Sequence, residues 1–188
     1  YVFVPIVPSP SMRPSRAPSF FNSLFGNPTS SSSAAEKKFT LANFASHHAS
    51  LAKLTQVNEK NKDGVIESIR AIAELIIWGD KHEPAIFEYF LEKNVLGVFW
   101  RILAREGTPL SVKQQLLQTL SILISNIEAG PSVFFILSNN HINELIAHPF
   151  DLSHEELLAH FVSLLKAIAL RLDKETVQFF IGEPQAKA

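Results

Sequence analysis

The sequence contains no cysteine, only one methionine and no long apolar run. Without cysteine the chain forms no disulfide and binds no metal through thiolates, which suits a reducing compartment. No apolar stretch approaches the roughly 20 residues that a helix needs to cross a bilayer. With 46% hydrophobic and 19% charged residues, the 188-residue chain has the composition of a soluble globular protein, with one sizeable core or several helical repeats.

A strong excess of either charge is also lacking, because the formal net charge is −1. The distribution is uneven: residues 1–62 carry seven Lys and Arg against two Glu, and the remainder carries ten basic against sixteen acidic side chains. The basic part falls mostly in a segment whose composition opposes folding. We therefore expect no nucleic-acid partner, and a weak attraction of that segment to anionic lipid is the better alternative.

Residues 1–38 contain six prolines and a serine run, which oppose both helix and packed sheet. They predict a disordered Pro/Ser-rich tail, in which Met12 is a possible true start. From Met12 onward the segment loosely resembles a transit peptide, since it has no acidic residue before Glu36. Ser19–Gly26 could touch a membrane but is too short to anchor the chain alone.

Apolar residues recur at steps of three and four over residues 39–182, which is the period of an amphipathic helix. No segment of useful length alternates with the period of two that a strand requires. We predict an all-α domain of about seven or eight helices. Short antiparallel helices in series favour an armadillo- or HEAT-like solenoid over a four-helix bundle, although no clean motif repeats at a fixed period.

Turn-forming residues predict where several helices end and begin. We expect Gly79 to end one helix and Pro84 to lie in the first turn of the next. Thr108-Pro109 predicts a cap followed by a proline at the first helical position. Asn139 or Asn140 is expected to cap a short helix.

A cluster of three histidines, one aspartate and two glutamates, His148 to His160, is the strongest candidate for metal or acid–base chemistry. A zincin needs two histidines four residues apart, so that both imidazoles share one helix face. Here His154 and His160 are six residues apart and point in different directions. A zinc site that uses His148, Asp151 and His154, and with it a metal-dependent enzyme, remains an alternative.

The same cluster reads more simply as the start of a long helix over about residues 153–172. Ser153 and Glu156 have the spacing of a capping box, and Leu152 and Leu157 that of a hydrophobic staple. Acidic residues in a first turn also suit the helix dipole. No glycine-rich phosphate loop or nucleophile elbow occurs elsewhere. We predict no catalytic residue, no cofactor and no small-molecule substrate.

Several stretches, collinear over about residues 50–181, resemble the FPL-domain family. They include Ile77-Trp78-Gly79-Asp80, Phe90-Leu91-Glu92-Lys93-Asn94, Leu137-Ser138-Asn139-Asn140 and Phe150-Asp151. This family comprises the N-terminal domain of the endosomal-maturation proteins and of proteins like C-type lectin domain family 16 member A. Its members are much longer, so residues 183–188 are expected to be a truncated continuation. The Pro/Ser-rich start also differs from the family's short basic N-terminus.

The resemblance implies a non-catalytic helical scaffold of endosome–lysosome (or vacuole) membrane trafficking and autophagy. It implies a cytoplasmic protein, peripherally associated with those membranes, whose partners are proteins of the tethering and autophagy machinery. It supplies no catalytic residue. The alternative is a lipid-binding module that contacts anionic membranes through the basic segment Met12–Lys38.

Polar residues at predicted turns are the candidates for contact with a protein partner. They are Trp78, Asp80, Glu92, Lys93, Asn94, Ser138, Asn139, Asn140 and Asp151. A structural role competes with this reading, because Asn and Asp often cap helices and turns, and a Trp is often buried.

Overall fold

The computed structural model describes residues 39–181, and within that range every regular element is a helix. The helices are α3 (Leu41–Ala52), α4 (Lys62–His82), α5 (Pro84–Glu92), α6 (Val95–Ala104), α7 (Leu110–Asn126), α8 (Gly130–Ser138), α9 (Asn140–Ala147), α10 (Glu155–Ala169) and α11 (Gln178–Ile181). The all-α prediction is confirmed. The described part holds nine helices rather than seven or eight, because one or two residues suffice to separate α5 from α6 and α8 from α9. The predicted tails, 1–38 with Met12 and 183–188, lie outside the described residues.

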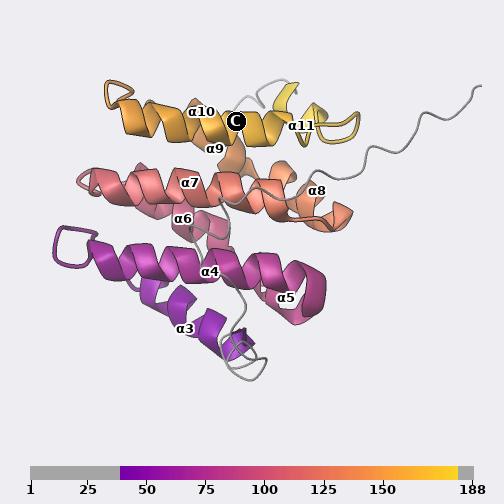
Figure 1. Ribbon diagram of the computed structural model, residues 1–188, viewed down its shortest axis with the longest axis horizontal. Coiled ribbons are helices and arrows are strands. Elements are labelled where there is room, and N and C mark those ends of the chain that lie inside the picture. The colour runs from indigo at the N-terminus through magenta and orange to yellow at the C-terminus, as the bar shows by residue number, and fades with distance from the viewer. Residues whose placement is uncertain (1–38, 182–188) are drawn as a thin grey trace, which may run out of the picture.

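Three long helices, α4, α7 and α10, lie side by side in one row and run in the same direction (Figure 1). The shorter helices α6 and α9 lie behind this row, and α5, α8 and α11 lie at the end where the long helices terminate. α3 packs beside α4 at the outer edge of the row. α7 is the central member and packs against α4 on one side and α10 on the other. Each shorter segment returns the chain so that the next long helix starts at the same edge.

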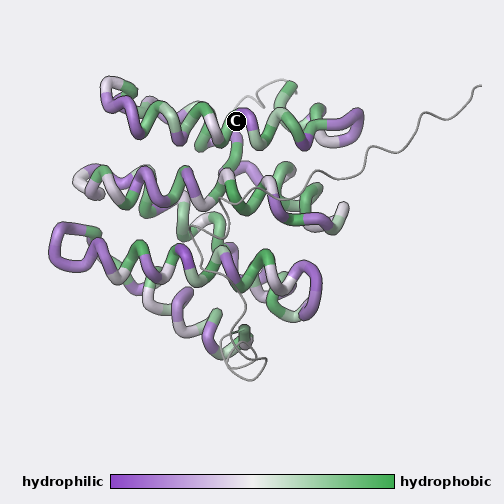
Figure 2. The backbone as a smooth tube through the Cα atoms, in the orientation of Figure 1, coloured by the Kyte–Doolittle hydropathy of each residue, from purple (hydrophilic) through white to green (hydrophobic). Residues whose placement is uncertain are grey.

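The core lies between the row of long helices and the shorter helices. Phe44, Phe90 and Phe99, from α3, α5 and α6, are almost wholly buried against aliphatic side chains of α4 and α7 such as Leu75 and Leu116. Burial of one such side chain contributes about 1.5–3 kcal/mol. Apolar and polar residues alternate along each long helix with its turns (Figure 2), as expected of helices that bury only part of their circumference.

Two of the predicted helix ends are confirmed. Pro84 lies in the first turn of α5, and Asn139 caps α9 by accepting a hydrogen bond from the backbone N–H of His141. Gly79 does not end α4, which continues to His82. Its role is close packing: a Cβ there would lie 2.7 Å from side-chain atoms of Ile86 in α5.

Two predicted caps are wrong. α7 begins after Pro109, at Leu110, and the Thr108 hydroxyl instead donates to the carbonyl of Ile102 in α6. The buried Thr108 thus satisfies the end of one helix rather than the start of the next.

The second wrong cap is the predicted capping box of Ser153 and Glu156. α10 begins at Glu155, one residue after His154, with no side-chain capping bond, and ends at Ala169. Ser153 lies in the turn before the helix, where its N–H donates to Asp151. The spacing of Ser153 and Glu156 could not show that Ser153 would bond to Asp151 in the turn instead of capping α10.

Candidate protein-interaction surface

The predicted contact residues lie at helix ends. Trp78 and Asp80 are in the last turns of α4, whereas Glu92, Lys93 and Asn94 are at the α5–α6 junction. Ser138, Asn139 and Asn140 are at the α8–α9 junction, and Asp151 is in the turn before α10. No hydrogen bond or ring contact within residues 39–181 joins one of these groups to another, so the structure does not gather them into one site.

Three of these residues hold local backbone structure. Asn94 adopts a left-handed conformation (φ 47°) and its side chain accepts from the Gly97 N–H at 3.2 Å, which starts α6. Asn139 caps α9 in the same way at 3.0 Å. Asp151 accepts from the Ser153 N–H at 3.1 Å, and the hydroxyl and N–H of Ser153 lower the pKa of that carboxyl.

Exposed members of the set make only short-range contacts. Glu92 and Lys93 form an ion pair at 2.5 Å, and Lys93 also lies 5.9 Å from the ring centroid of Tyr89. Asn140 donates to Glu144 at 3.0 Å, and the Ser138 hydroxyl donates to the carbonyl of Phe135. Surface pairs of this kind add little to stability, so these side chains can exchange partners readily.

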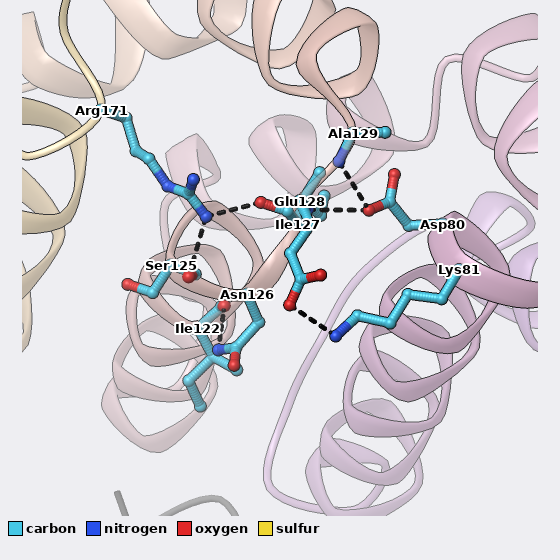
Figure 3. A network of polar contacts seen from close by, with 9 residues as sticks. All are labelled: Asp80, Lys81, Ile122, Ser125, Asn126, Ile127, Glu128, Ala129 and Arg171. Carbon is cyan, nitrogen blue, oxygen red and sulfur yellow. Dashed lines mark hydrogen bonds and ion pairs between the residues drawn. The ribbon is translucent and has the colours of Figure 1, made fainter. Parts of the chain in front are cut away.

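Asp80 instead holds two long-range contacts, which Figure 3 shows. Its Oδ2 accepts from the backbone N–H groups of Glu128 at 2.8 Å and Ala129 at 3.1 Å, in the turn between α7 and α8. Lys81 adds an ion pair to Glu128 at 2.6 Å. The end of α4 is therefore tied to the turn that follows α7.

Arg171 approaches the same turn from the other side (Figure 3). It follows α10, and its guanidinium donates to the carbonyls of Ile124, Ser125 and Ile127 at 2.9, 2.9 and 2.5 Å. These carbonyls lie at the C-terminal end of α7, where no intrahelical donor remains. Sequence reasoning missed Arg171, since its acceptors lie more than 40 residues away and no local pattern marks it.

An open groove lies between α3 and α4, with a volume of about 430 Å³. We call it the α4 groove, and it is lined by Asn43, His47, Asp63, Ile66, Glu67, Arg70, Ala71 and Glu74. Three carboxylates thus face one guanidinium. That guanidinium, of Arg70, already donates to Gln115 at 2.8 Å. The groove therefore favours a positively charged occupant.

Trp78 lies beyond the groove, one helical turn after Glu74 on the same side of α4. It is half-buried and stacks on Phe39 with ring centroids 5.1 Å apart. His82 meets the ring edge-on at 5.0 Å. None of the nine predicted residues lines this hollow, and Trp78 is the one that lies a single helical turn from a lining residue.

The histidines of the predicted zinc alternative lie apart. His148 packs edge-on against the rings of Trp100 at 5.3 Å and Phe150 at 4.6 Å, and burial lowers its pKa. His154 lies 3.8 Å from Asp151, and His160 is on α10. No three His, Asp or Glu side chains within residues 39–181 converge as metal ligands. The described part thus gives the zinc alternative no geometric support.

Residues 39–181 thus form an all-helical fold of stacked long helices with an open acidic groove between α3 and α4. None of the described helices combines the length and apolarity needed to span a bilayer. The FPL family, described as an uncharacterised conserved protein, matches residues 69–187, and the chain belongs to this family.

Relatives from animals and plants carry the same region. The chain is 45% identical over 133 residues to the CLEC16A homolog of Caenorhabditis elegans and to human CLEC16A, in each case over 71% of this chain. It is 43% identical over 144 residues, or 77% of this chain, to the protein TRANSPARENT TESTA 9 of Arabidopsis thaliana. It spans only 15%, 12% and 17% of these relatives. No solved structure matches the chain.

Proposed function

We propose that the chain is a non-catalytic helical interaction module that acts in endosome–lysosome (or vacuole) membrane trafficking and autophagy. The observation that carries the proposal is membership of the FPL family, with 45% identity to human CLEC16A over 133 residues. The trafficking role comes from the family resemblance and is extended here to this chain. Its partners are proteins of the tethering and autophagy machinery, met at the cytoplasmic surface of those membranes.

The row of long helices supports an armadillo- or HEAT-like array. In such arrays each unit contacts only its neighbours, and one face of the stack forms an extended binding surface. Here α7 packs on α4 and α10 packs on α7, with shorter helices returning the chain between them (Figure 1). This arrangement suits a protein whose function is to present a surface to other proteins.

We place the partner in the α4 groove. Asp63 and Glu67 are exposed and line it, and Trp78 lies one helical turn beyond the lining residue Glu74. A basic segment of a partner protein would pair with the carboxylates, and an apolar side chain of that segment would rest on Trp78. Glu92, Lys93 and Asn140 are secondary contacts. Asp80, Asn94, Ser138, Asn139 and Asp151 support the neighbouring turns.

Proximity labelling of the protein in its own cells tests the proposal. The test variant carries Asp63→Asn and Glu67→Gln, which remove two charges from the groove while keeping side-chain size. The matched control carries Glu88→Gln and Glu106→Gln, which remove two exposed charges elsewhere. Urea unfolding of both variants first shows that stability is unchanged.

We expect the wild type and control to label endolysosomal tethering and autophagy proteins, and the groove variant to lose several-fold of that labelling. Equal labelling by both variants would refute the groove as the binding site and keep the pathway. Neighbours from an unrelated compartment would refute the pathway itself. If removal of Met12–Lys38 alone abolished membrane association, the lipid-binding alternative would replace this proposal.

A further inference from the structure

The outer face of α10 exposes a stripe of apolar side chains. Leu158 and Val162 are 38% and 52% exposed, Leu165 is half-buried and Ala169 is exposed. At about 100° per residue, these four lie within one narrow sector of the helix. The sector is opposite Glu156, which bonds to α7. The stripe therefore points away from α7, along the direction in which the long helices are stacked.

The same spacing of residues is found on the faces through which α4 contacts α7 and α7 contacts α10. On α4 the face toward α7 carries Arg70, Ala73, Ile77 and Asp80, at spacings of three, four and three residues. On α7 the face toward α10 carries Gln114, Leu117, Ser121 and Ile124, at the same spacings. On α10 the outer stripe repeats them as Glu155, Leu158, Val162 and Leu165. Successive sets are roughly 40 residues apart, the period of a two- or three-helix repeat.

At both helix contacts, α4 with α7 and α7 with α10, the first stripe residue donates a hydrogen bond to the next long helix. Arg70 donates to Gln115 at 2.8 Å, and Gln114 donates to Glu156 at 2.9 Å. In both cases the acceptor directly follows the first stripe residue of the next long helix. Glu155, the first stripe residue of α10, is exposed and makes no hydrogen bond to the described residues.

The two inner stripes are covered, and no residue between 39 and 181 covers the third. Ile77 and Leu117 are 8% and 0% exposed because α7 and α10 lie over them. The stripe from Glu155 to Ala169 is about 21 Å long at about 1.5 Å per residue, so a helix of about 14 residues or more is needed to cover it.

We propose that the outer stripe of α10 is the packing surface for a fourth long helix of the same polypeptide, parallel to α10. That helix carries its own apolar stripe and, near its first turns, a Lys, Arg or Gln side chain that donates to Glu155. The relatives are six to eight times as long as the matched region, which gives them ample chain for such a helix. The inference depends on the stacked helices and not on the pathway proposed above.

Because the 188 residues contain no cysteine, single thiols can report on this face. Val162→Cys places a thiol in the stripe, and Ser163→Cys places one on the next residue, exposed but outside the stripe. Each variant is made in the 188-residue chain and in the protein at its native length. Maleimide labelling is followed at that residue by peptide mass spectrometry.

In the 188-residue chain both thiols should react at similar rates. At native length the thiol at position 162 should react at least ten times more slowly, and the thiol at position 163 should keep its rate. Equal rates at native length would overturn the proposal, as would a native polypeptide that ends at Ala188. Protection that rises with concentration in the 188-residue chain would overturn it in favour of a second copy. Protection that disappears when the native-length protein is purified alone would assign the face to another protein.

Val162→Glu provides a second readout. In the 188-residue chain the carboxylate stays in water, and the midpoint of urea unfolding should not change. At native length the same charge would be buried under the fourth helix, and the midpoint of unfolding should fall. An unchanged midpoint at native length would contradict a covered stripe.

Discussion

Replacement of Asp80 should destabilise the fold although the residue lies near the surface. Its Oδ2 is the acceptor for two backbone N–H groups, of Glu128 and Ala129, at 2.8 and 3.1 Å. A hydrogen bond to a charged acceptor contributes about 1.5–3 kcal/mol where the donor would otherwise be buried. Glu128 is exposed and Ala129 is half-buried, so water replaces part of this loss. For Asp80→Ala we expect the free energy of unfolding to fall by about 2–3 kcal/mol.

Asp80→Asn separates the hydrogen bonds from the charge. The amide oxygen can still accept from both N–H groups, but its NH₂ would occupy the site of Oδ1, which is buried without a partner among the described residues. We expect a loss of about 1 kcal/mol for this variant. Glu88→Ala, an exposed carboxylate on α5, is the matched control and should change stability by less than about 0.5 kcal/mol.

Urea unfolding monitored by circular dichroism measures these differences as shifts of the midpoint at constant slope. Hydrogen exchange should locate the effect, because the amides of residues 128 and 129 lose protection first. The reasoning is refuted if Asp80→Ala has the stability of the control. It is also refuted if Asn costs as much as Ala, because the bonds to the turn would then not be the cause.

Three further predictions follow from single contacts. Gly79→Ala should lower the free energy of unfolding by about 1–3 kcal/mol, because the new Cβ would lie 2.7 Å from Ile86. The control Gly64→Ala, whose Cβ would meet no atom within 4 Å, should raise it by roughly 0.5 kcal/mol. Equal midpoints of urea unfolding for the two variants would contradict this. Arg171→Lys should lower the free energy of unfolding by about 2 kcal/mol, since an ammonium cannot replace a guanidinium that donates to three carbonyls. Hydrogen exchange should become faster in the α7–α8 turn, and an increase confined to α11 would contradict this prediction. Burial, with Lys93 and Arg101 nearby, lowers the pKa of His48 below its ordinary 6.5, so the unfolded chain binds the proton more tightly. Stability should therefore fall as pH drops through 6.5, and His48→Asn should flatten that fall; a variant with the wild-type pH profile of unfolding would exclude this histidine as the source.

The sequence predicted the helices well and the helix ends unevenly. Pro84 and Asn139 were placed correctly, because a proline in a first turn and an Asn cap act within a few residues of the chain. Ser153 and Thr108 were placed wrongly, although both fit the same rules. Each had a competing partner, Asp151 beside Ser153 and the carbonyl of Ile102 for Thr108. Both partners lie within six residues, so a local rule can name the competing bonds but cannot decide which of them forms.

For the candidate surface the sequence predicted Trp78, but it predicted neither the α4 groove nor the acidic residues that line this groove. In the sequence, Asp63 and Glu67 are indistinguishable from ordinary solvent-exposed residues of a helix. They line a groove only because α3 packs beside α4. Arg171 and the recurring stripes of α4, α7 and α10 were equally hidden. These features are recognised by where the residues lie on the packed helices, because the residue types at matching positions differ from one helix to the next.

Residue patterns alone predict that the described part is helical, where most helices lie and to which family the chain belongs. The period of apolar residues and the local chemistry of caps suffice for the first two, because both depend on neighbours within one or two turns. Two further features could be seen only once the helices were packed. Asp80 and Arg171 bind one turn from opposite sides, and α10 lies at the edge of the described row with an apolar face outward. These relations join residues more than 40 positions apart or separate helices. Each follows from how the helices pack, which no single segment of the chain specifies alone.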